Sequence, residues 1–313
     1  MILALAFVAL PCLFRAQGAE AAPTLKAAGI ERVCVPPERV DEWKAAGFIA
    51  LPLSQADLAR REVLLVPGIR PGGADRVSAT RSPWVNANGW RFRREPGKAW
   101  TYKLPAGTAA LAAAEAFAQG ADAGLEIDEA DLPKLGEMMA FLARVPVRTL
   151  PDVADIAVVD NGSPFLPEVL NLLARRNLLF KLVPQPSAEF RTNVTLGSPE
   201  YPERDAADPS AFALKVRRQH TDEQRAFRVF GSEGIIGRLT ADGTRVRLHL
   251  LNYSGRELEG LRIRVRGTYP NGEALVAGVG PVPLEDHTVD EGATEFTLVR
   301  LGTYGIVDLP PEK

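Results

Sequence analysis

The sequence predicts an α/β region followed by an all-β region. Strand-like and helix-like runs alternate between residues 26 and 150, which is typical of a parallel sheet covered by helices. A further strand–helix–strand pattern spans residues 155–184. From Phe227 onward the hydrophobic period changes to two, which indicates an antiparallel β-sandwich of about 90 residues.

The α/β region is predicted from short apolar runs and from the residues that begin and end helices. The expected strands are residues 32–36, 48–53, 62–67 and 123–128, and the expected helices are residues 38–46, 107–119, 131–144 and one that opens at Ser54–Asp57. Gly47 and Gly120 follow two of these helices, as is common at helix C-termini. Residues 68–82 are rich in Gly, Arg and Pro and are expected to form a long loop.

The later elements follow a linker that Pro146 and Pro151 bracket. Strand 155–160, helix 166–176 and strand 178–184 form one βαβ unit, and residues 185–219 are expected to be loops. In the sandwich, alternation predicts two sets of side chains. The inward set is Val246, Leu248, Leu250, Leu261, Ile263 and Val265, and the outward set is Arg245, Arg247, His249, Arg262, Arg264 and Arg266.

Residues 1–22 have the pattern of a secretory signal peptide. Met1–Phe14 is an apolar run too short to span a bilayer, and Ala19 and Ala21 give an A-x-A pattern before Ala22. We therefore expect cleavage after Ala21 or Ala22 and export to the periplasm or the medium. A buried amino-terminal helix is the alternative, because no Lys or Arg precedes the run. Cleavage would leave Cys34 alone, unable to form an intrachain disulfide, and no remaining stretch would cross a membrane.

The predicted organisation is therefore a leader at 1–22, an α/β region at 23–150, a βαβ region at 151–220 and a sandwich at 221–313. The composition excludes several classes of protein. The chain has 313 residues and a formal net charge of −2, without the basic surplus that a nucleic-acid binder needs. Two cysteines and three histidines leave little for a metal centre, and no G-x-G-x-x-G motif is present, so we expect neither metal nor cofactor.

Four stretches resemble parts of exported TIM-barrel glycoside hydrolases. RVRLHLLNYSGRELEGLRIRVRG at residues 245–267 and EGATEFTLVRLGTYGIVDL at 291–309 are similar to their carboxy-terminal β-domain. PAGTAALAAAEAFAQGADAGLEID at 105–128 is similar to the last helix–strand turns of such barrels. DIAVVD at 155–160 resembles the start of the flavodoxin-like or amidotransferase-like domain of β-galactosidase-type enzymes.

The resemblance implies a protein that acts on or binds carbohydrate. A full barrel needs about 250 residues, and the DIAVVD strand begins at residue 155, so the resemblance implies a partial or degenerate (β/α) barrel-like region. If active, the protein would be a glycoside hydrolase with a carboxylate acid or base. The alternative is a non-catalytic carbohydrate-binding or protein-scaffolding module, and the sequence leaves a homo-oligomer open.

A tryptophan–asparagine string is the first candidate for binding sugar. If residues 84–90 are extended, Trp84, Asn86, Asn88 and Trp90 share one face, where indole rings stack on pyranose and amides bond hydroxyls. Trp100 lies close enough in the sequence to extend this strip. The alternative is a structural tryptophan pair with asparagines in turns.

Two carboxylates at the end of strand 123–128 are the catalytic candidates. Glu126 and Asp128 share one face, and ligand sites of parallel α/β folds gather at this end. Asp128 is equally placed to cap the following helix. Glu115, inside the Ala-rich helix, is expected to be solvated or to pair with a neighbouring helix. Asp160 follows the DIAVVD strand and is a candidate ligand residue, with a simple turn as the alternative.

The outward arginines of the sandwich have two interpretations. A cationic surface for an acidic glycan is one interpretation, and a solvated sheet face balanced by Glu257, Glu259 and Asp290 is the other.

Overall fold

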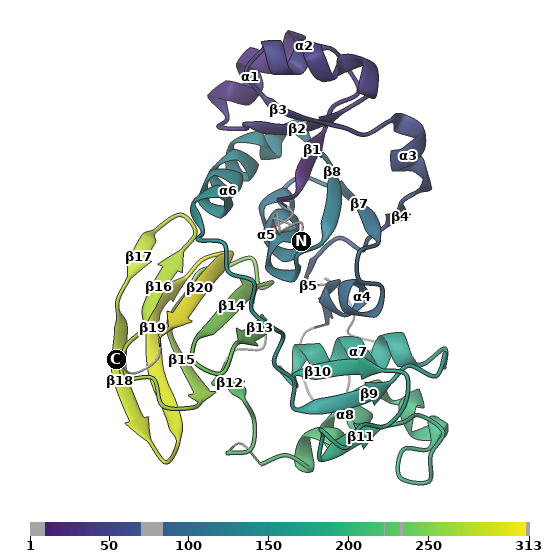
Figure 1. Ribbon diagram of the computed structural model, residues 1–313, viewed down its shortest axis with the longest axis vertical. Helices are drawn as coiled ribbons and strands as arrows, with labels where there is room; N and C mark the ends of the chain where they lie inside the picture. Colours follow the sequence, from purple (N-terminus) through teal and green to yellow (C-terminus); the bar gives the residue numbers. More distant parts are fainter. Residues whose placement is uncertain (1–9, 70–83, 222, 232–233, 311–313) are drawn as a thin grey trace, which may run out of the picture. The chain divides into compact units, whose positions relative to one another are not determined.

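The computed structural model describes residues 10–69, 84–221, 223–231 and 234–310, and the ribbon is drawn in Figure 1. The chain forms two compact units. Unit 1 comprises Met1–Pro67 and Glu95–Thr149, and unit 2 comprises Gly68–Arg94 and Leu150–Lys313. The βαβ and sandwich regions that the sequence predicts separately both belong to unit 2.

Unit 1 contains a six-stranded parallel sheet in the order β3-β2-β1-β8-β7-β4. Its strands are β1 (Cys12–Phe14), β2 (Arg32–Val35), β3 (Ile49–Pro52), β4 (Glu62–Val63), β7 (Ala99–Leu104) and β8 (Asp122–Ile127). Its helices are α1 (Ala22–Ala27), α2 (Val40–Ala45), α3 (Gln55–Arg60), α5 (Ala109–Gln119) and α6 (Leu132–Arg144). Short 3-10 turns are η1 (Ala19–Ala21), η2 (Pro37–Arg39) and η4 (Glu129–Asp131).

The strand order of unit 1 is that of a parallel barrel opened at one point. The chain steps from β1 to β2 to β3, and later from β4 to β7 to β8, in the same direction along the sheet, and β8 lies beside β1. Right-handed crossovers that all step one way put their helices on one face of the sheet, as in a barrel. Among the described strands, β3 and β4 are the pair that would have to bond to close the ring, and each is an edge of the sheet.

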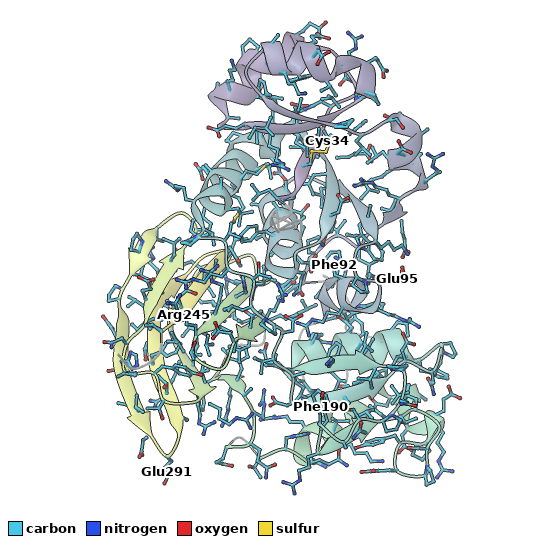
Figure 2. The ribbon with its side chains drawn as sticks, in the orientation of Figure 1. Cys34, Phe92, Glu95, Phe190, Arg245 and Glu291 are labelled. Atoms are coloured by element: carbon cyan, nitrogen blue, oxygen red, sulfur yellow. A yellow bond between two sulfur atoms is a disulfide. The ribbon has the colours of Figure 1, made fainter. Side chains whose placement is uncertain are left out.

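Strand β1 changes the interpretation of residues 1–22. It is buried and pairs on both sides, with β2 and with β8. Cys12 forms a disulfide with Cys34, with 5.5 Å between the Cα atoms, and Figure 2 shows this bond beside Cys34. Cleavage after Ala21 or Ala22 would remove this central strand and half of the disulfide. The structure therefore does not support a removable segment that extends to residue 22. In the uncleaved chain Cys34 is not alone, because Cys12 is its disulfide partner.

The helices of unit 1 pack closely because their contact residues are small. Ala112, Ala113 and Ala116 of α5 are fully buried, and α5 packs against both β8 and α6. Gly136 of α6 lies against the Ala28 carbonyl after α1, where an added Cβ would stand 1.6 Å from that oxygen. Only glycine permits this approach.

The first part of unit 2 is a three-stranded parallel sheet in the order β10-β9-β11. The elements of this part are β9 (Ile156–Val159), α7 (Leu166–Arg175), β10 (Phe180–Val183), β11 (Thr192–Val194), η5 (Glu203–Ala207) and α8 (Pro209–Arg218). Three earlier elements belong to the same unit: β5 (Gly68–Ile69), β6 (Val85–Asn86) and α4 (Gly89–Arg94). The predicted βαβ unit is confirmed. The prediction of loops over residues 185–219 is wrong, because β11 and α8 form there; Asp208 caps α8 through the Ala211 amide at 3.0 Å.

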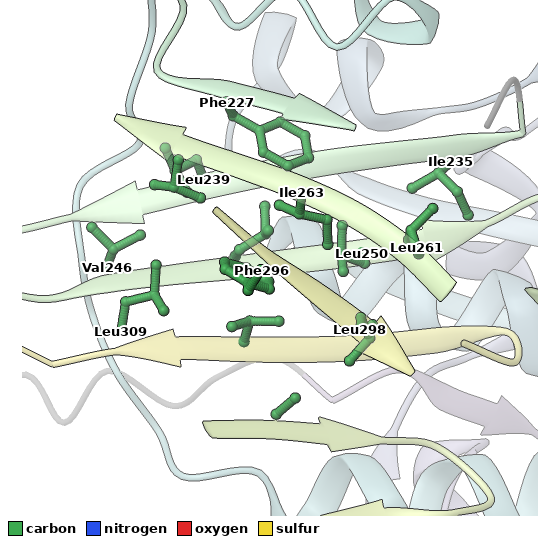
Figure 3. Packing of buried hydrophobic residues seen from close by; sticks show 14 of the residues in the cluster. Phe227, Ile235, Leu239, Val246, Leu250, Leu261, Ile263, Phe296, Leu298 and Leu309 are labelled. Carbon is green, nitrogen blue, oxygen red and sulfur yellow. The ribbon is translucent and has the colours of Figure 1, made fainter. Parts of the chain in front are cut away.

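The sandwich of unit 2 consists of two antiparallel sheets. One has the order β12-β15-β19-β18 and the other β13-β14-β20-β16-β17. Their strands are β12 (Phe227–Val229), β13 (Ile235–Ala241), β14 (Val246–Asn252), β15 (Leu258–Arg266), β16 (Glu273–Val276), β17 (Gly280–Val282), β18 (Leu284–Asp290), β19 (Ala293–Leu301) and β20 (Tyr304–Leu309). All six side chains predicted to face inward are buried in one cluster with Phe227 and Phe296, and Figure 3 shows its packing.

Hydrogen bonds join the βαβ part to the sandwich within unit 2. The Asn177 side chain donates to the Ile235 carbonyl at 2.9 Å and accepts from the Gly237 amide at 2.7 Å. The Arg225 guanidinium donates to the carbonyls of Arg176 and Asn177, both at 2.9 Å. These buried bonds explain why the two parts form one compact unit.

Within the described parts of the chain, no helix is long and apolar enough to cross a membrane.

Candidate functional site

The carboxyl end of strand β8 carries the first candidate residue, Glu126. Strands β7 and β8 are parallel, with Lys103 opposite Glu126 in the register. Because side chains alternate along a strand, Glu126 faces away from the side of the sheet on which Leu125 is fully buried. Parallel α/β proteins bind ligands at this edge of the sheet. The structure therefore puts Glu126 and Lys103 where a ligand site is expected.

Glu126 is also chemically available. It is half-buried, and it forms no hydrogen bond or ion pair with any residue that the structure describes, while neighbouring Lys103 is exposed. A carboxylate with unused lone pairs accepts hydrogen bonds from sugar hydroxyls and can exchange a proton. An ammonium group supplies only donors. The two side chains together can therefore hold one sugar hydroxyl as donor and another as acceptor.

Asp128 is engaged in the local fold. Its carboxylate accepts a hydrogen bond from the Ala130 amide at 2.9 Å and begins the turn η4. This is the capping role that the sequence left open. The backbones of Glu126 and Asp128 are about 7 Å apart, as positions i and i+2 of an extended chain are. A catalytic role for Asp128 stays a prediction.

An ion pair that sequence analysis missed lies at the same edge. The Arg15 guanidinium, just after β1, bonds both carboxylate oxygens of Glu129, just after the neighbouring strand β8. The two residues are 114 positions apart, and Arg15 falls in the segment that was assigned to the leader. The pair ties η4 to β1 and so holds the turn that follows Glu126.

Asp131 stabilises the next loop of this edge. It is buried, and its carboxylate accepts three backbone amides at the start of α5, from Gly107 at 2.6 Å and from Thr108 and Ala109 at 3.0 Å. A carboxylate suits the amino end of a helix because the unpaired amides and the helix dipole both attract negative charge. The loop after β7 and the turn after β8 are thereby joined beside Glu126.

An open groove lies next to this edge, between α1 and α6. Its volume is about 570 Å³, within the range of small-molecule sites. Thr24, Glu129, Pro133 and Glu137 are among the lining residues, and most of the others are alanine, glycine or leucine. The groove therefore presents little polar surface beyond these carboxylates and one hydroxyl.

The tryptophan–asparagine string does not form the predicted strip. Only Val85–Asn86 is a strand, and helix α4 begins at Gly89, so the four side chains do not share a face. Trp90 is 7% exposed within the core around α7, and Trp84 packs against the same core with the Arg175 guanidinium over its ring. Asn88 is completely buried. The prediction of one extended binding strip is wrong, and the structural alternative accounts for both tryptophans.

Trp100 and its neighbours are buried in unit 1. Trp100 and Tyr102 of β7 are inaccessible, with the Lys98 ammonium 4.5 Å from the Trp100 ring centroid. The Tyr102 hydroxyl donates to Glu115, which is fully buried in α5. Of the two expected roles, solvation is wrong because Glu115 is fully buried, and the partner that the structure gives it is a strand residue, Tyr102 of β7. Trp100 belongs to a different unit from Trp84, and its buried ring offers no stacking surface.

Asp160 follows strand β9 as expected, but its carboxylate forms an ion pair with an arginine. Arg94, at the end of α4, donates to both carboxylate oxygens at 2.6 and 3.0 Å. The Gly162 amide donates to the same carboxylate at 3.3 Å. Asp160 therefore links α4 to the βαβ sheet and forms the turn that was the alternative, while ligand binding by this residue stays a prediction.

The polar face of strand β14 is buried rather than solvated. Arg247 makes two hydrogen bonds of 2.7 Å to Asp308, and His249 Nδ1 lies 2.7 Å from the Tyr304 hydroxyl. Burial, together with the charges of Arg238 and Arg247, holds the pKa of His249 well below its ordinary value. The expectation that Arg247 and His249 face solvent is wrong, because alternation gives the direction of a side chain but not what covers it.

In the described ranges, no group of three or more His, Cys, Asp or Glu side chains is placed to hold a metal ion.

Solved structures that match this chain include a fucosidase and a β-galactosidase. The α-L-fucosidase isoenzyme 2 from Paenibacillus thiaminolyticus superposes with a TM-score of 0.53 and 9% identity over 88% of this chain and 70% of that chain. The cold-adapted β-galactosidase from Rahnella sp. R3 gives a TM-score of 0.41 and 10% identity, over 71% of this chain and 56% of that chain. No protein-family model matches the chain, and neither does any curated protein.

The fold of this chain is therefore glycoside hydrolase-like, with parallel α/β sheets in the amino-terminal half and a sandwich of antiparallel sheets after them. The identity with the fucosidase is too low for more than a likeness of fold, and the superposition with the galactosidase is too loose to support any inference.

Proposed function

We propose that this chain is a glycoside hydrolase-like protein that binds carbohydrate at the carboxyl edge of the unit 1 sheet. The likeness of fold to the fucosidase, over 88% of this chain, is the observation that carries the proposal. Glu126 and Lys103 supply an acceptor and a donor at that edge. The order of a barrel-like sheet, a βαβ part and a sandwich is also that of the β-galactosidase-type arrangement, which we propose as the finer relationship.

Hydrolysis would use Glu126 as the acid or base. Glycoside hydrolysis generally needs two carboxyl groups, about 5–5.5 Å apart in retaining enzymes and about 6.5–9.5 Å apart in inverting ones. Asp128 is the second candidate by position. Its bond to the Ala130 amide occupies one oxygen and leaves the other for a water molecule or a sugar hydroxyl.

Binding without hydrolysis is the second candidate function. The capping role of Asp128 favours it, because Glu126 is then the one of the two predicted catalytic residues that the fold does not use. Both candidates need the same edge of the sheet and differ in whether a glycosidic bond is broken.

Glycan binding by the full chain tests the proposal. We expect the protein to bind at least one glycan of a neutral plant and microbial panel, and we expect Glu126→Gln to weaken that binding roughly tenfold, the cost of a hydrogen bond to a charged group. The matched control is Glu31→Gln, an exposed carboxylate just before β2, at the opposite edge of the same sheet.

Release of sugar from the bound glycan separates the two candidates. If Glu126→Gln and Asp128→Asn both abolish release, the hydrolase is supported; if the wild type binds but releases nothing, the binding module is supported. Equal binding by wild type and Glu126→Gln would refute the proposed site.

Export of the protein stays a prediction. The Cys12–Cys34 disulfide is compatible with an oxidising compartment, where such bonds persist.

A further inference from the structure

One outer face of the sandwich gathers positive charge although the whole chain has a formal net charge of −2. Phe227 of β12 and Leu261, Ile263 and Val265 of β15 point into the core. Alternation therefore puts the residues between and after them on the outside. We name this set the arginine face; it consists of Arg228, Phe230, Arg262, Arg264 and Arg266.

The pairing of β12 with β15 brings like charges together. Arg228 stands directly opposite Arg264 in the antiparallel register. Like charges in this position destabilise a sheet. The pairing therefore puts two positive side chains side by side on the outer face of the sheet.

One carboxylate serves two of the arginines. Glu295, opposite Arg264 on β19, lies 2.6 Å from the Arg262 guanidinium and 3.8 Å from that of Arg264. The Arg262 side chain is nevertheless 58% exposed. Its outer edge therefore remains accessible to an anion from solution.

Arg266 extends the face toward the loop before β12. It donates to the Gln224 carbonyl at 2.8 Å, lies 4.0 Å from the buried carboxylate of Asp155, and is 52% exposed. A hydrogen bond from Thr221 and, more weakly, the charges of Arg264 and Arg228 lower the pKa of Glu223 on the same loop. Asp155 and Glu223 are acids on the β12 side of the face.

An aromatic ring completes the face. The guanidinium carbons of Arg228 and Arg262 lie 4.1 and 5.9 Å from the centroid of the half-buried Phe230 ring. This contact holds the two guanidinium groups in place through cation–π attraction. Ordered arginines lose less conformational entropy when an anion binds to them.

Among the other acids of the same sheet, Glu259 lies at the start of β15, opposite Arg300 of β19, and the rest named here lie on the far edge. Strand β18 carries Glu285 and Asp290, and it is separated from β12 by β15 and β19. Three strand spacings amount to about 14 Å, beyond the Debye length of about 8 Å at physiological ionic strength. The acids of β18 therefore do little to neutralise Arg228 of β12, whereas the three arginines of β15 are two strand spacings, about 10 Å, from β18.

We infer that the arginine face binds an anionic polysaccharide through the carboxylate or sulfate groups on successive sugars. Guanidinium groups bind both kinds of oxyanion in a two-pronged geometry. The side chains of Arg262 and Arg266 are 58% and 52% exposed, whereas Arg264 between them is 12% exposed. Arg262 and Arg266 are four positions apart on the strand, about 14 Å, so one extended acidic chain that lies along β15 can contact both. This inference rests on the proposed carbohydrate context and names a glycan class for a surface other than the Glu126 edge.

Affinity measurements with the full chain test the inference. The probes are polygalacturonate, which carries carboxylates, chondroitin sulfate, which carries both carboxylate and sulfate, and dextran, which is uncharged. We expect the double variant Arg262→Gln/Arg266→Gln to bind the acidic probes at least tenfold more weakly than the wild type at 50 mM NaCl. The control Arg39→Gln/Arg60→Gln removes two exposed arginines of unit 1 and should leave affinity within twofold.

A variant that should bind more tightly controls for loss of binding through misfolding. Glu295→Gln removes the carboxylate that Arg262 and Arg264 share, so we expect about threefold tighter binding of acidic probes and a thermal midpoint that shows a folded sandwich. Preference for chondroitin sulfate over polygalacturonate would identify sulfate as the main ligand group, and the reverse would identify carboxylate.

The inference is overturned if the double variant and its control bind acidic probes equally, or if duplex DNA binds more tightly than either acidic glycan. The neutral panel used for the Glu126 edge is measured separately. Loss of acidic-glycan binding alone therefore refutes the arginine face, and loss of neutral-glycan binding alone refutes the proposed function.

Discussion

The parallel sheet of unit 1 and the sandwich of unit 2 use their polar side chains differently. In unit 1, Glu126 lies at the end of a strand and has no partner among the described residues. In unit 2, Arg247 and His249 lie in the middle of a strand, and each has a partner on β20, Asp308 and Tyr304. The parallel sheet leaves a polar group at a strand end available for a ligand, whereas the sandwich pairs the polar groups of β14 with buried partners on β20.

The cause of this difference is topological. Parallel strands joined by helices all end at the same edge, so side chains there extend past the packed layers. Antiparallel strands bring mid-strand residues opposite one another, and a buried polar group in such a place needs a partner or costs about 1–3 kcal/mol. Polar residues at strand ends of unit 1 are therefore better candidates for function than those in the sandwich core.

The largest expected effect concerns the tryptophan that the sequence offered as a sugar-binding residue. Trp90→Ala removes a buried ring from the core around α7, and we expect it to lower the free energy of unfolding by about 3–5 kcal/mol. Urea denaturation followed by circular dichroism measures this change. Trp84→Ala is the comparison, with a smaller loss because Trp84 is only partly buried. If Trp90→Ala is as stable as the wild type but no longer binds glycan, Trp90 is a sugar-binding residue, and the difference between the two units does not hold.

The disulfide of unit 1 should have the next largest effect. It closes a loop of 22 residues between adjacent strands, and its removal in Cys12→Ala/Cys34→Ala should lower the free energy of unfolding by about 3 kcal/mol. A reducing agent should destabilise the wild type and leave the variant unchanged. If the purified mature chain begins at residue 22 or 23 and ignores the reducing agent, strand β1 does not belong to the native sheet.

The smallest effect is a pH dependence of the sandwich. The pKa of His249 is lowered in the folded state by burial, and it is near 6.5 when the chain is unfolded. The unfolded state therefore binds the extra proton first, and stability falls as the pH drops below about 6.5, by at most about 1.4 kcal/mol per pH unit.

The variant His249→Gln tests this origin of the slope. It should flatten the pH dependence of the thermal midpoint between pH 6.5 and 5, and a residual slope is expected because burial also lowers the pKa of His220. If the thermal midpoint of His249→Gln falls with pH as steeply as that of the wild type, His249 is accessible to solvent in the folded protein. The polar face of β14 would then be open to ligands, like the strand ends of unit 1.

Sequence periodicity predicted the elements whose faces are repetitive. The helix expected at 131–144 forms as α6, and the two-residue period of β14 and β15 gave the correct strands and inward residues, because one buried face imposes the pattern. Helix α8 was predictable in principle from Asp208 and Pro209, a capping residue followed by proline. Residues 84–90 were misassigned because alternation over so short a stretch does not distinguish a strand from the start of a helix.

The sequence by itself determined the elements that have a sustained period, such as α6, β14 and β15, and which side chains of β14 and β15 turn inward, since a local period follows directly from backbone geometry. The tertiary structure decided which polar groups remain available. Arg94 reaches Asp160 across 66 positions and Arg15 reaches Glu129 across 114, while Glu126 is left without a partner among the described residues. Such pairing depends on segments that meet only in the folded chain, so no local pattern records it.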